Sequence, residues 1–175
     1  MRDRLLNAAE QVVGRDGVAN LTLEAVANEA GVSKGGLLYH FPTKSALITA
    51  IVERMAVQCE GDQERAVAAD PCPTGAFTRA YLAARAEPRE PHKRPVHTAL
   101  LAAAGTDPQY LDPFRKRFLE WQARLASDGI APEVATIVRL ALDGLALGRL
   151  LDLPGPEGEL RRKVIEKLIS MTRGE

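Results

Sequence analysis

The sequence carries no excess charge of either sign, because 23 lysines and arginines balance 23 aspartates and glutamates over 175 residues. A net charge of zero excludes a chain-wide attraction to nucleic acid, so any basic surface has to be local. Cysteine is scarce: Cys59 and Cys72 are the only two, and they lack the C-x-x-C spacing of a zinc or redox site. Two isolated thiols favour a reducing cytosol, with a disulfide between them as the alternative.

Long uncharged apolar runs are also missing. The most apolar stretch, VRLALDGLALGRLLDL at residues 138–153, is interrupted by two arginines and two aspartates, so we expect no membrane span. The opening residues MRDRLLNAAE are charged and amphipathic, which is unlike a secretory signal. These features predict a cytoplasmic protein with no membrane partner.

Strand patterns are almost absent, because β-branched residues do not alternate with polar ones over any useful length. Helical periodicity is found along most of the chain, as in the residues Leu111, Phe114, Phe118, Trp121 and Leu125, which are spaced three and four apart. We therefore predict an all-α fold of about nine helices. The stretch DPCPTG at residues 70–75 marks a joint. We divide the chain into domains of residues 1–50 and 51–175, linked by a helix from about 43 to 65.

Residues 21–40, LTLEAVANEAGVSKGGLLYH, contain two helix starts around a turn. Thr22 and Ser33 are suited to N-caps, because their hydroxyls can accept hydrogen bonds from the free N–H groups of a first turn. Gly31 is suited to the left-handed conformation that ends a helix. Two short helices joined by a turn of about three residues match the plan of a helix-turn-helix.

Two lysines and two glycines in this region work against local helix stability. Lys34 and Lys44 follow the expected caps, where a cation opposes the helix dipole unless an anion such as a phosphate binds there. Gly35 and Gly36 each cost about 1 kcal/mol relative to alanine. They also let the helix backbone approach a second surface closely, and a DNA major groove is such a surface. The pattern predicts DNA binding.

The run TLEAVANEAGVSKGGLLYHFPTKSALI resembles the N-terminal DNA-binding motif of TetR/AcrR-type transcriptional regulators, over about residues 5–52. The resemblance implies a three-helix helix-turn-helix domain followed by a helical ligand-binding and dimerisation domain. It also implies a homodimeric repressor that is released from a palindromic double-stranded operator by an unknown small-molecule effector, without enzyme activity or cofactor. A helical protein-interaction module and a small helical enzyme using His97 and Asp143 are the alternatives without DNA binding.

The resemblance assigns DNA-binding roles by position. The residues expected to contact mainly phosphates are Thr22, Ser33, Lys34, Tyr39, His40 and Lys44. The residues expected to face the major groove are Gly35, Gly36 and Leu37. Many family members carry a basic tail before the first helix, whereas here Asp3 lies between Arg2 and Arg4, so we expect no minor-groove arm.

Two further sets of residues are candidates in the larger domain. A mostly apolar cavity with a few polar groups would suit a small molecule, although a satisfied core explains the same residues: Tyr81, His97, Thr98, Phe114, Phe118, Trp121 and Gln122. Gly144 and Gly148 are small residues four apart, and this spacing allows close helix packing. Together with the last helix they predict a self-complementary dimer interface. Its residues are Leu140, Gly144, Leu147, Gly148, Leu151, Leu160, Val164 and Leu168. Arg139 and Asp143, four apart, predict an ion pair within one helix.

Overall fold

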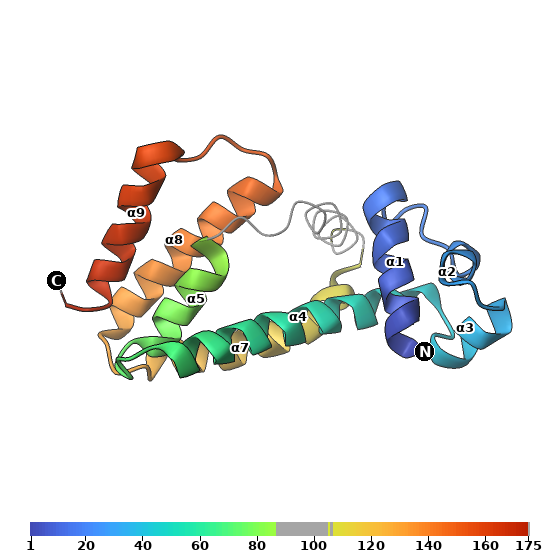
Figure 1. Ribbon diagram of the computed structural model, residues 1–175, viewed down its shortest axis with the longest axis horizontal. Helices are drawn as coiled ribbons and strands as arrows, with labels where there is room; N and C mark the ends of the chain where they lie inside the picture. Colours follow the sequence, from blue (N-terminus) through green and yellow to red (C-terminus); the bar gives the residue numbers. More distant parts are fainter. Residues whose placement is uncertain (87–104, 106, 175) are drawn as a thin grey trace. The chain divides into compact units, whose positions relative to one another are not determined.

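The computed structural model describes residues 1–86, 105 and 107–174, and all regular structure in these residues is helical (Figure 1). The elements are α1 (Arg2–Asp16), α2 (Leu23–Ala30), α3 (Lys34–His40), α4 (Lys44–Ala69), α5 (Ala76–Ala86), the 3-10 helix η2 (Pro108–Leu111), α7 (Asp112–Ala126), α8 (Pro132–Leu150) and α9 (Gly158–Met171). The predicted all-α class is confirmed. None of the described helices has the length and apolar character needed to cross a lipid bilayer.

The chain forms two compact units, and each contains segments from distant parts of the sequence. The first unit comprises residues 1–57 and 90–116, and the second comprises residues 58–89 and 117–175. Helix α4 contributes to both, because the division falls between Val57 and Gln58. Helix α7 also contributes to both, with its first residues in the first unit.

The core of the first unit is built around α1. Apolar residues recur at helical spacing along this helix and are almost completely buried, namely Leu5, Leu6, Ala9, Val12 and Val13. Arg54 fastens α4 to α1, since its guanidinium lies 2.7 Å from both Glu10 Oε1 and Asn7 Oδ1. Tyr110 and Phe114 pack against the same core from much later in the chain.

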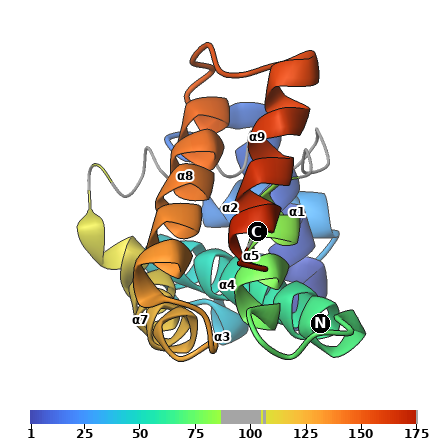
Figure 2. The same cartoon turned by 90° about the vertical axis from the view of Figure 1, so that its left-hand side faces the viewer.

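The second unit packs α5 against α8 and α9 (Figure 2). Helix α5 begins where it does because the carboxylate of Asp128, 50 residues further along, accepts hydrogen bonds from Phe77 N at 3.1 Å and Thr78 N at 2.7 Å. Ion pairs join α4 to α7, between Glu60 and Arg117 at 3.0 Å and between Glu64 and Arg124.

Candidate nucleic-acid interface

The turn between α2 and α3 has the geometry expected of a helix-turn-helix. Thr22 Oγ1 accepts a hydrogen bond from Ala25 N at 3.0 Å, and Ser33 Oγ accepts one from Gly36 N at 3.1 Å. Gly31 adopts a left-handed conformation with φ 61° and ψ 44° and ends α2. Both caps and the turn glycine are therefore placed by local sequence chemistry, which fixes how α3 follows α2.

Leu37 lies on the inner face of α3, and the expectation that it faces the major groove was wrong. Its side chain is fully buried in the core of the first unit, together with Val26 and Ala27 of α2. A helix of seven residues presents few side chains to its own domain, and Leu37 is the one that is buried and anchors it there. The neighbouring Leu38 is 38% exposed.

The outward face at the start of α3 carries almost no side-chain bulk. A Cβ atom added at Gly35 would meet nothing within 4 Å among the described residues, and one at Gly36 would meet only Ser33 Oγ at 3.3 Å. Neither glycine needs a positive φ. At Gly35, packing and backbone geometry within the described part of the chain therefore give no reason for glycine, and the surface there is open to close approach from outside.

Polar side chains flank this open face. Lys34 is about 60% exposed, and its Nζ lies 3.8 Å from the exposed carboxylate of Glu24, a surface contact of little energetic consequence. Tyr39 is 86% exposed and meets the His40 ring edge-on, with centroids 5.2 Å apart. The exposure of Tyr39 argues against a packing role and leaves its hydroxyl accessible.

Lys44 begins α4, after a cap in which Thr43 Oγ1 accepts a hydrogen bond from Ala46 N at 3.0 Å. Its ammonium donates a hydrogen bond to Ala19 O at 3.2 Å, so Lys44 also holds the segment that precedes α2. An ammonium has three donors, and two remain for other partners. A phosphate contact at Lys44 would therefore share the side chain with a structural hydrogen bond.

Sequence reasoning missed the contribution of the first turn of α1. Arg4 Nη2 donates a hydrogen bond to Gly31 O at 3.3 Å, and the Arg2 guanidinium lies 5.5 Å from the centre of the Phe41 ring. Two cations thus lie against the turn and the end of α3. The sequence shows the two arginines on either side of Asp3, but only the fold shows that they contact Gly31 and Phe41.

Comparisons with known proteins agree with this geometry. Residues 5–51 match the family described as "Bacterial regulatory proteins, tetR family", and residues 75–173, more than half of the chain, match "Tetracyclin repressor-like, C-terminal domain". The chain belongs to the TetR family. Proteins of this family are DNA-binding regulators rather than enzymes.

Curated relatives within the TetR family match only part of the chain. The HTH-type transcriptional regulator UidR of Escherichia coli K12 is 37% identical over 67 residues, which span 38% of this chain and 31% of UidR. TtgR of Pseudomonas putida is 35% identical over 54 residues, which span 31% of this chain and 26% of TtgR. The chain therefore matches less than a third of the length of either relative.

Solved structures match over nearly the whole chain. The multidrug binding protein EbrR complexed with malachite green is 30% identical, with a TM-score of 0.67, and the match covers 96% of this chain and 97% of EbrR. The putative transcriptional regulator SCO7518 of Streptomyces coelicolor is 20% identical, with a TM-score of 0.76 and coverage of 98% and 97%. The second likeness shows the shared fold alone.

The structure brings together some of the residues expected to line a ligand cavity. Buried Tyr81 donates a hydrogen bond to Asp143 Oδ1 at 2.6 Å, and the Arg85 guanidinium lies 3.5 Å from the centre of the Tyr81 ring and 5.7 Å from that of Trp121. Burial raises the pKa of Tyr81 above its usual value. Arg139 lies over the Phe118 ring at 5.5 Å. These aromatic rings therefore share a region of the second unit.

Other members of that set lie elsewhere. Phe114 packs against the core of the first unit, so its expected place in the cavity was wrong. Gln122 is partly buried on α7. His97 and Thr98 lie outside the described residues. The predicted ion pair between Arg139 and Asp143 is confirmed, with an N–O distance of 3.0 Å.

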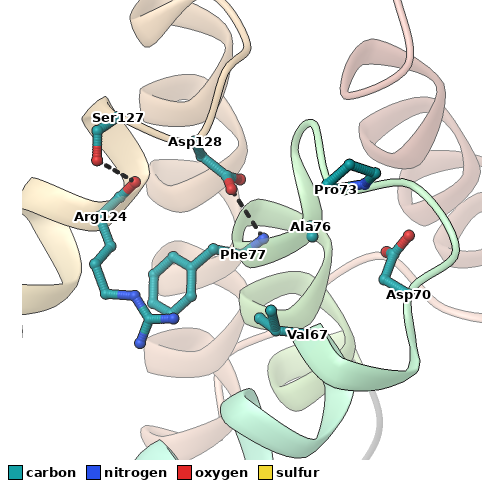
Figure 3. Close-up of a pocket in the computed structure, with 8 residues that line it drawn as sticks. All are labelled: Val67, Asp70, Pro73, Ala76, Phe77, Arg124, Ser127 and Asp128. Atoms are coloured by element: carbon teal, nitrogen blue, oxygen red, sulfur yellow. Dashed lines mark hydrogen bonds between the residues drawn. The ribbon is translucent and has the colours of Figure 1, made fainter.

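A pocket of about 330 Å³ in the second unit is lined by none of the expected ligand residues that the structure describes. Figure 3 shows its position where α4, α5 and the end of α7 meet, with Arg124 extended beside the Phe77 ring. Its lining residues are Val67, Asp70, Pro73, Ala76, Phe77, Arg124, Ser127 and Asp128. Asp128 is already occupied in capping α5, and Asp70 binds Arg79 at 2.7 Å.

Most residues of the expected dimer interface lie on the outside of the protomer. Exposed leucines are Leu140, Leu147, Leu151 and Leu160, while Val164 is partly buried. A Cβ added at Gly144 or Gly148 would meet nothing within 4 Å among the described residues. Leu168 is only 6% exposed, so its side chain is already buried within its own protomer and its expected interface role was wrong. Ile137, 49% exposed, extends the exposed row and was missed.

Proposed function

We propose that this chain is a transcriptional repressor that binds a palindromic operator as a homodimer and leaves it when a small molecule binds. Residues 1–50 would read DNA, residues 51–175 would bind the ligand and dimerise, and α4 would link the two functions. The single observation that carries the proposal is the open backbone face at Gly35, beside a capped helix start and Lys34. Its place of action would be the cytoplasm, where bacterial operators lie.

Phosphates explain the polar groups around the open face. The first turns of α3 and α4 have free N–H groups, each helix start has a capping hydroxyl, and each is followed by a lysine. Such a helix end attracts an anion through its N–H groups and dipole. Tyr39 and His40 would add contacts at the far end of α3. Because base-reading side chains are few here, groove shape and backbone contacts would contribute much of the specificity.

A second copy of the chain explains the apolar face of α8. Ile137, Leu140, Gly144, Leu147 and Leu151 recur at spacings of three and four and remain exposed in the single protomer. Exposed apolar surface of this kind is typical of an interface, and a two-fold arrangement would let the same face of both copies pack together. The helix-turn-helix of each copy would act as a reading head, that is, the part that contacts DNA. Two reading heads related by a two-fold axis would require a palindromic operator.

A ligand in the second unit is supported by the likeness to EbrR, which is described as a multidrug binding protein and is complexed with malachite green or imidazole. A ligand changes DNA affinity only if it binds one conformation of the dimer more tightly than another. Because α4 contributes to both units, a change in its position in the second unit would be passed to the first.

Selection of bound sequences from random DNA, followed by fluorescence anisotropy at several salt concentrations, tests the function. A two-fold symmetric consensus is expected, and the logarithm of affinity should fall with the logarithm of salt concentration by roughly 0.9 for each phosphate contacted. An enzyme or a protein-interaction module would select no consensus and would show no such dependence. Absence of both a consensus sequence and a salt dependence would therefore contradict the proposed function.

A further inference from the structure

Among the described residues, the core of the second unit contains a buried glutamine whose side-chain amide makes no hydrogen bond. Four polar or charged residues are buried among the described residues: Gln63, Thr78, Arg79 and Thr172. The last three each make at least one hydrogen bond, to Asp128, Asp70 and Ile169 respectively. Gln63 is 0% exposed, and neither its Nε2 nor its Oε1 atom has a partner within the described part of the chain.

A buried amide without hydrogen bonds destabilises the folded protein. Folding removes its donor and its acceptor from water and returns no hydrogen bond, and native proteins contain few such groups. A methionine or leucine at residue 63 would fill similar space without this penalty. The Gln63 side chain thus lowers the stability of the protomer, which indicates a hydrogen-bonding partner that the described part of the protomer does not supply.

The ion pairs between α4 and α7 show what lies opposite Gln63. Glu60 pairs with Arg117, and Glu64 pairs with Arg124. Gln63 lies between Glu60 and Glu64 in the sequence of α4, and Trp121 lies between Arg117 and Arg124 in the sequence of α7. Trp121 is 1% exposed. The register therefore places the buried amide at the level of the buried indole.

Aromatic faces dominate this level of the core. The Arg85 guanidinium lies over the Trp121 ring and over the Tyr81 ring, and the Tyr81 hydroxyl is bound by Asp143. Asp143 is held in turn by Arg139 at 3.0 Å. The charged groups here are engaged with each other and with the rings, whereas the amide of Gln63 is neutral and offers one donor edge and one acceptor edge.

We propose that Gln63 is the recognition residue for a small, flat, neutral ligand that presents a hydrogen-bond donor and an acceptor side by side, as a lactam, a primary amide or a nucleobase does. A glutamine amide pairs with such an edge through two parallel hydrogen bonds. The ligand would lie beside Trp121 and satisfy both amide atoms at once. This inference rests on the proposed function, because it names the class of effector for the ligand-binding unit.

The pocket lined by Val67 and Phe77 gives a route toward this amide. Val67 is four residues from Gln63 and lies one helical turn further along the same face of α4. Phe77 is 3% exposed and lies under the Arg124 guanidinium at 4.0 Å. Movement of the Phe77 and Arg124 side chains would connect the pocket with the core, as happens when a ligand selects a minor open conformation.

Thermal unfolding of the full-length protein with defined probes tests the proposal. The probes are 2-pyridone and 2-quinolone, whose ring N–H and C=O are adjacent, and the controls are their N-methyl derivatives, which lack the donor. At ten times its Kd, a probe should raise the Tm by roughly 3 to 6 °C. The N-methyl controls should give no shift. Absence of a shift with both probes at millimolar concentration would overturn the proposal.

Two variants assign any shift to the amide. Gln63→Met should keep or raise the Tm of the free protein and should abolish the probe shift. Gln58→Met, at an exposed position of the same helix, should retain the full shift. A lower Tm for the free Gln63→Met protein would mean that water already satisfies the amide in solution, which overturns the proposal, and so would a probe shift that survives the substitution.

Operator binding, measured in parallel, separates this inference from the proposed function. A shift that depends on Gln63 in a protein that selects no DNA sequence would support the ligand site and reject the repressor. Selection of a palindrome without any lactam shift would support the repressor and reject Gln63 as the recognition residue.

Discussion

The backbone at Gly35 is ordinary helix, and nothing among the described residues occupies the space where a side chain would lie. Glycine at such a site weakens the helix by about 1 kcal/mol relative to alanine. A gain outside the folded protomer has to offset that loss. Close approach of DNA to the backbone of α3 would provide it, and stability and affinity should then respond in opposite directions to a methyl group.

Gly35→Ala should raise the free energy of unfolding by about 0.5 to 1 kcal/mol and weaken operator binding roughly tenfold, or about 1.4 kcal/mol. Urea unfolding and fluorescence anisotropy measure the two effects. The matched control is Gly61→Ala on α4, where an added Cβ would meet, among the described residues, only Arg65 Nη1 at 3.5 Å. That variant should gain similar stability without loss of affinity. Unchanged operator affinity in Gly35→Ala would contradict the close approach.

Lys34 offers a test of phosphate contact that leaves the fold intact. Its contact with Glu24 joins two exposed side chains, and a cation at a helix start opposes the helix dipole, so Lys34→Ala should leave the free energy of unfolding unchanged or raise it by a few tenths of a kcal/mol. The slope of log affinity against log salt should fall by about 0.9, equally for operator and random DNA. Lys163→Ala on α9 is the control, since Lys163 is also exposed and lies 3.7 Å from a glutamate. Equal slopes for the two variants would rule out a phosphate at Lys34.

At the scale of the element, the helix-turn-helix could be predicted well because its signals are local. Thr22, Gly31 and Ser33 act on backbone groups within four residues of themselves, and the structure shows each in its expected role. The rotation of α3 about its axis could not be predicted from the sequence, because Leu37 and Leu38 are adjacent and only the packed domain decides which of them is buried. Leu37 is the buried one.

Helix α7 shows why periodicity does not identify a partner. One apolar stripe of this helix contains Phe114, Phe118 and Trp121 at spacings of three and four. The spacing alone does not distinguish their surroundings. The helix contributes to both units, so Phe114 enters one core and Trp121 the other. The cap that Asp128 forms on α5 has a related cause, because a contact across 50 residues leaves no local pattern.

The junction of α4 and α5 should make the second unit sensitive to acid. Hydrogen bonds from the Arg79 guanidinium hold the pKa of Asp70 below its usual value. A lowered folded-state pKa means that the pair stabilises the protein fully above the unfolded pKa of about 3.9. This stabilisation is lost as the pH falls through the folded-state pKa.

Asp70→Asn should therefore lower the free energy of unfolding near neutral pH, while the difference from the wild type shrinks as the pH falls below about 3.9. Urea unfolding at a series of pH values measures this difference. Asp62→Asn, at an exposed site on α4, is the control and should show little effect. A constant difference at all pH values would mean that the Asp70 charge does not stabilise the fold.

For the whole molecule, the decisive property is assembly. The row from Ile137 to Leu151 on α8 leaves apolar side chains in solvent when the protomer is considered alone. The proposed two-fold pairing would cover them, and both reading heads would then contact one operator. Loss of pairing should reduce operator affinity even when the helix-turn-helix is intact, because each head would bind its half-site independently.

Leu147→Glu should convert the protein to a monomer, because a carboxylate buried at a symmetric interface faces its own copy. Sedimentation velocity would detect the change, and operator affinity should fall by at least tenfold. Leu119→Glu on α7, where the native side chain is 70% exposed, should leave the sedimentation coefficient unchanged. A Leu147→Glu protein that still sediments as a dimer would place the interface elsewhere.

The contribution of Tyr110 and Phe114 to the first unit has a consequence for synthesis. These rings pack on a core whose other members lie in the first 55 residues. A nascent chain that has released only its amino-terminal helices from the ribosome therefore lacks part of the apolar cover of its reading head. The first unit can therefore reach its final packing only after translation has passed residue 114, so it should finish folding late in synthesis, well after its helix-turn-helix has been made.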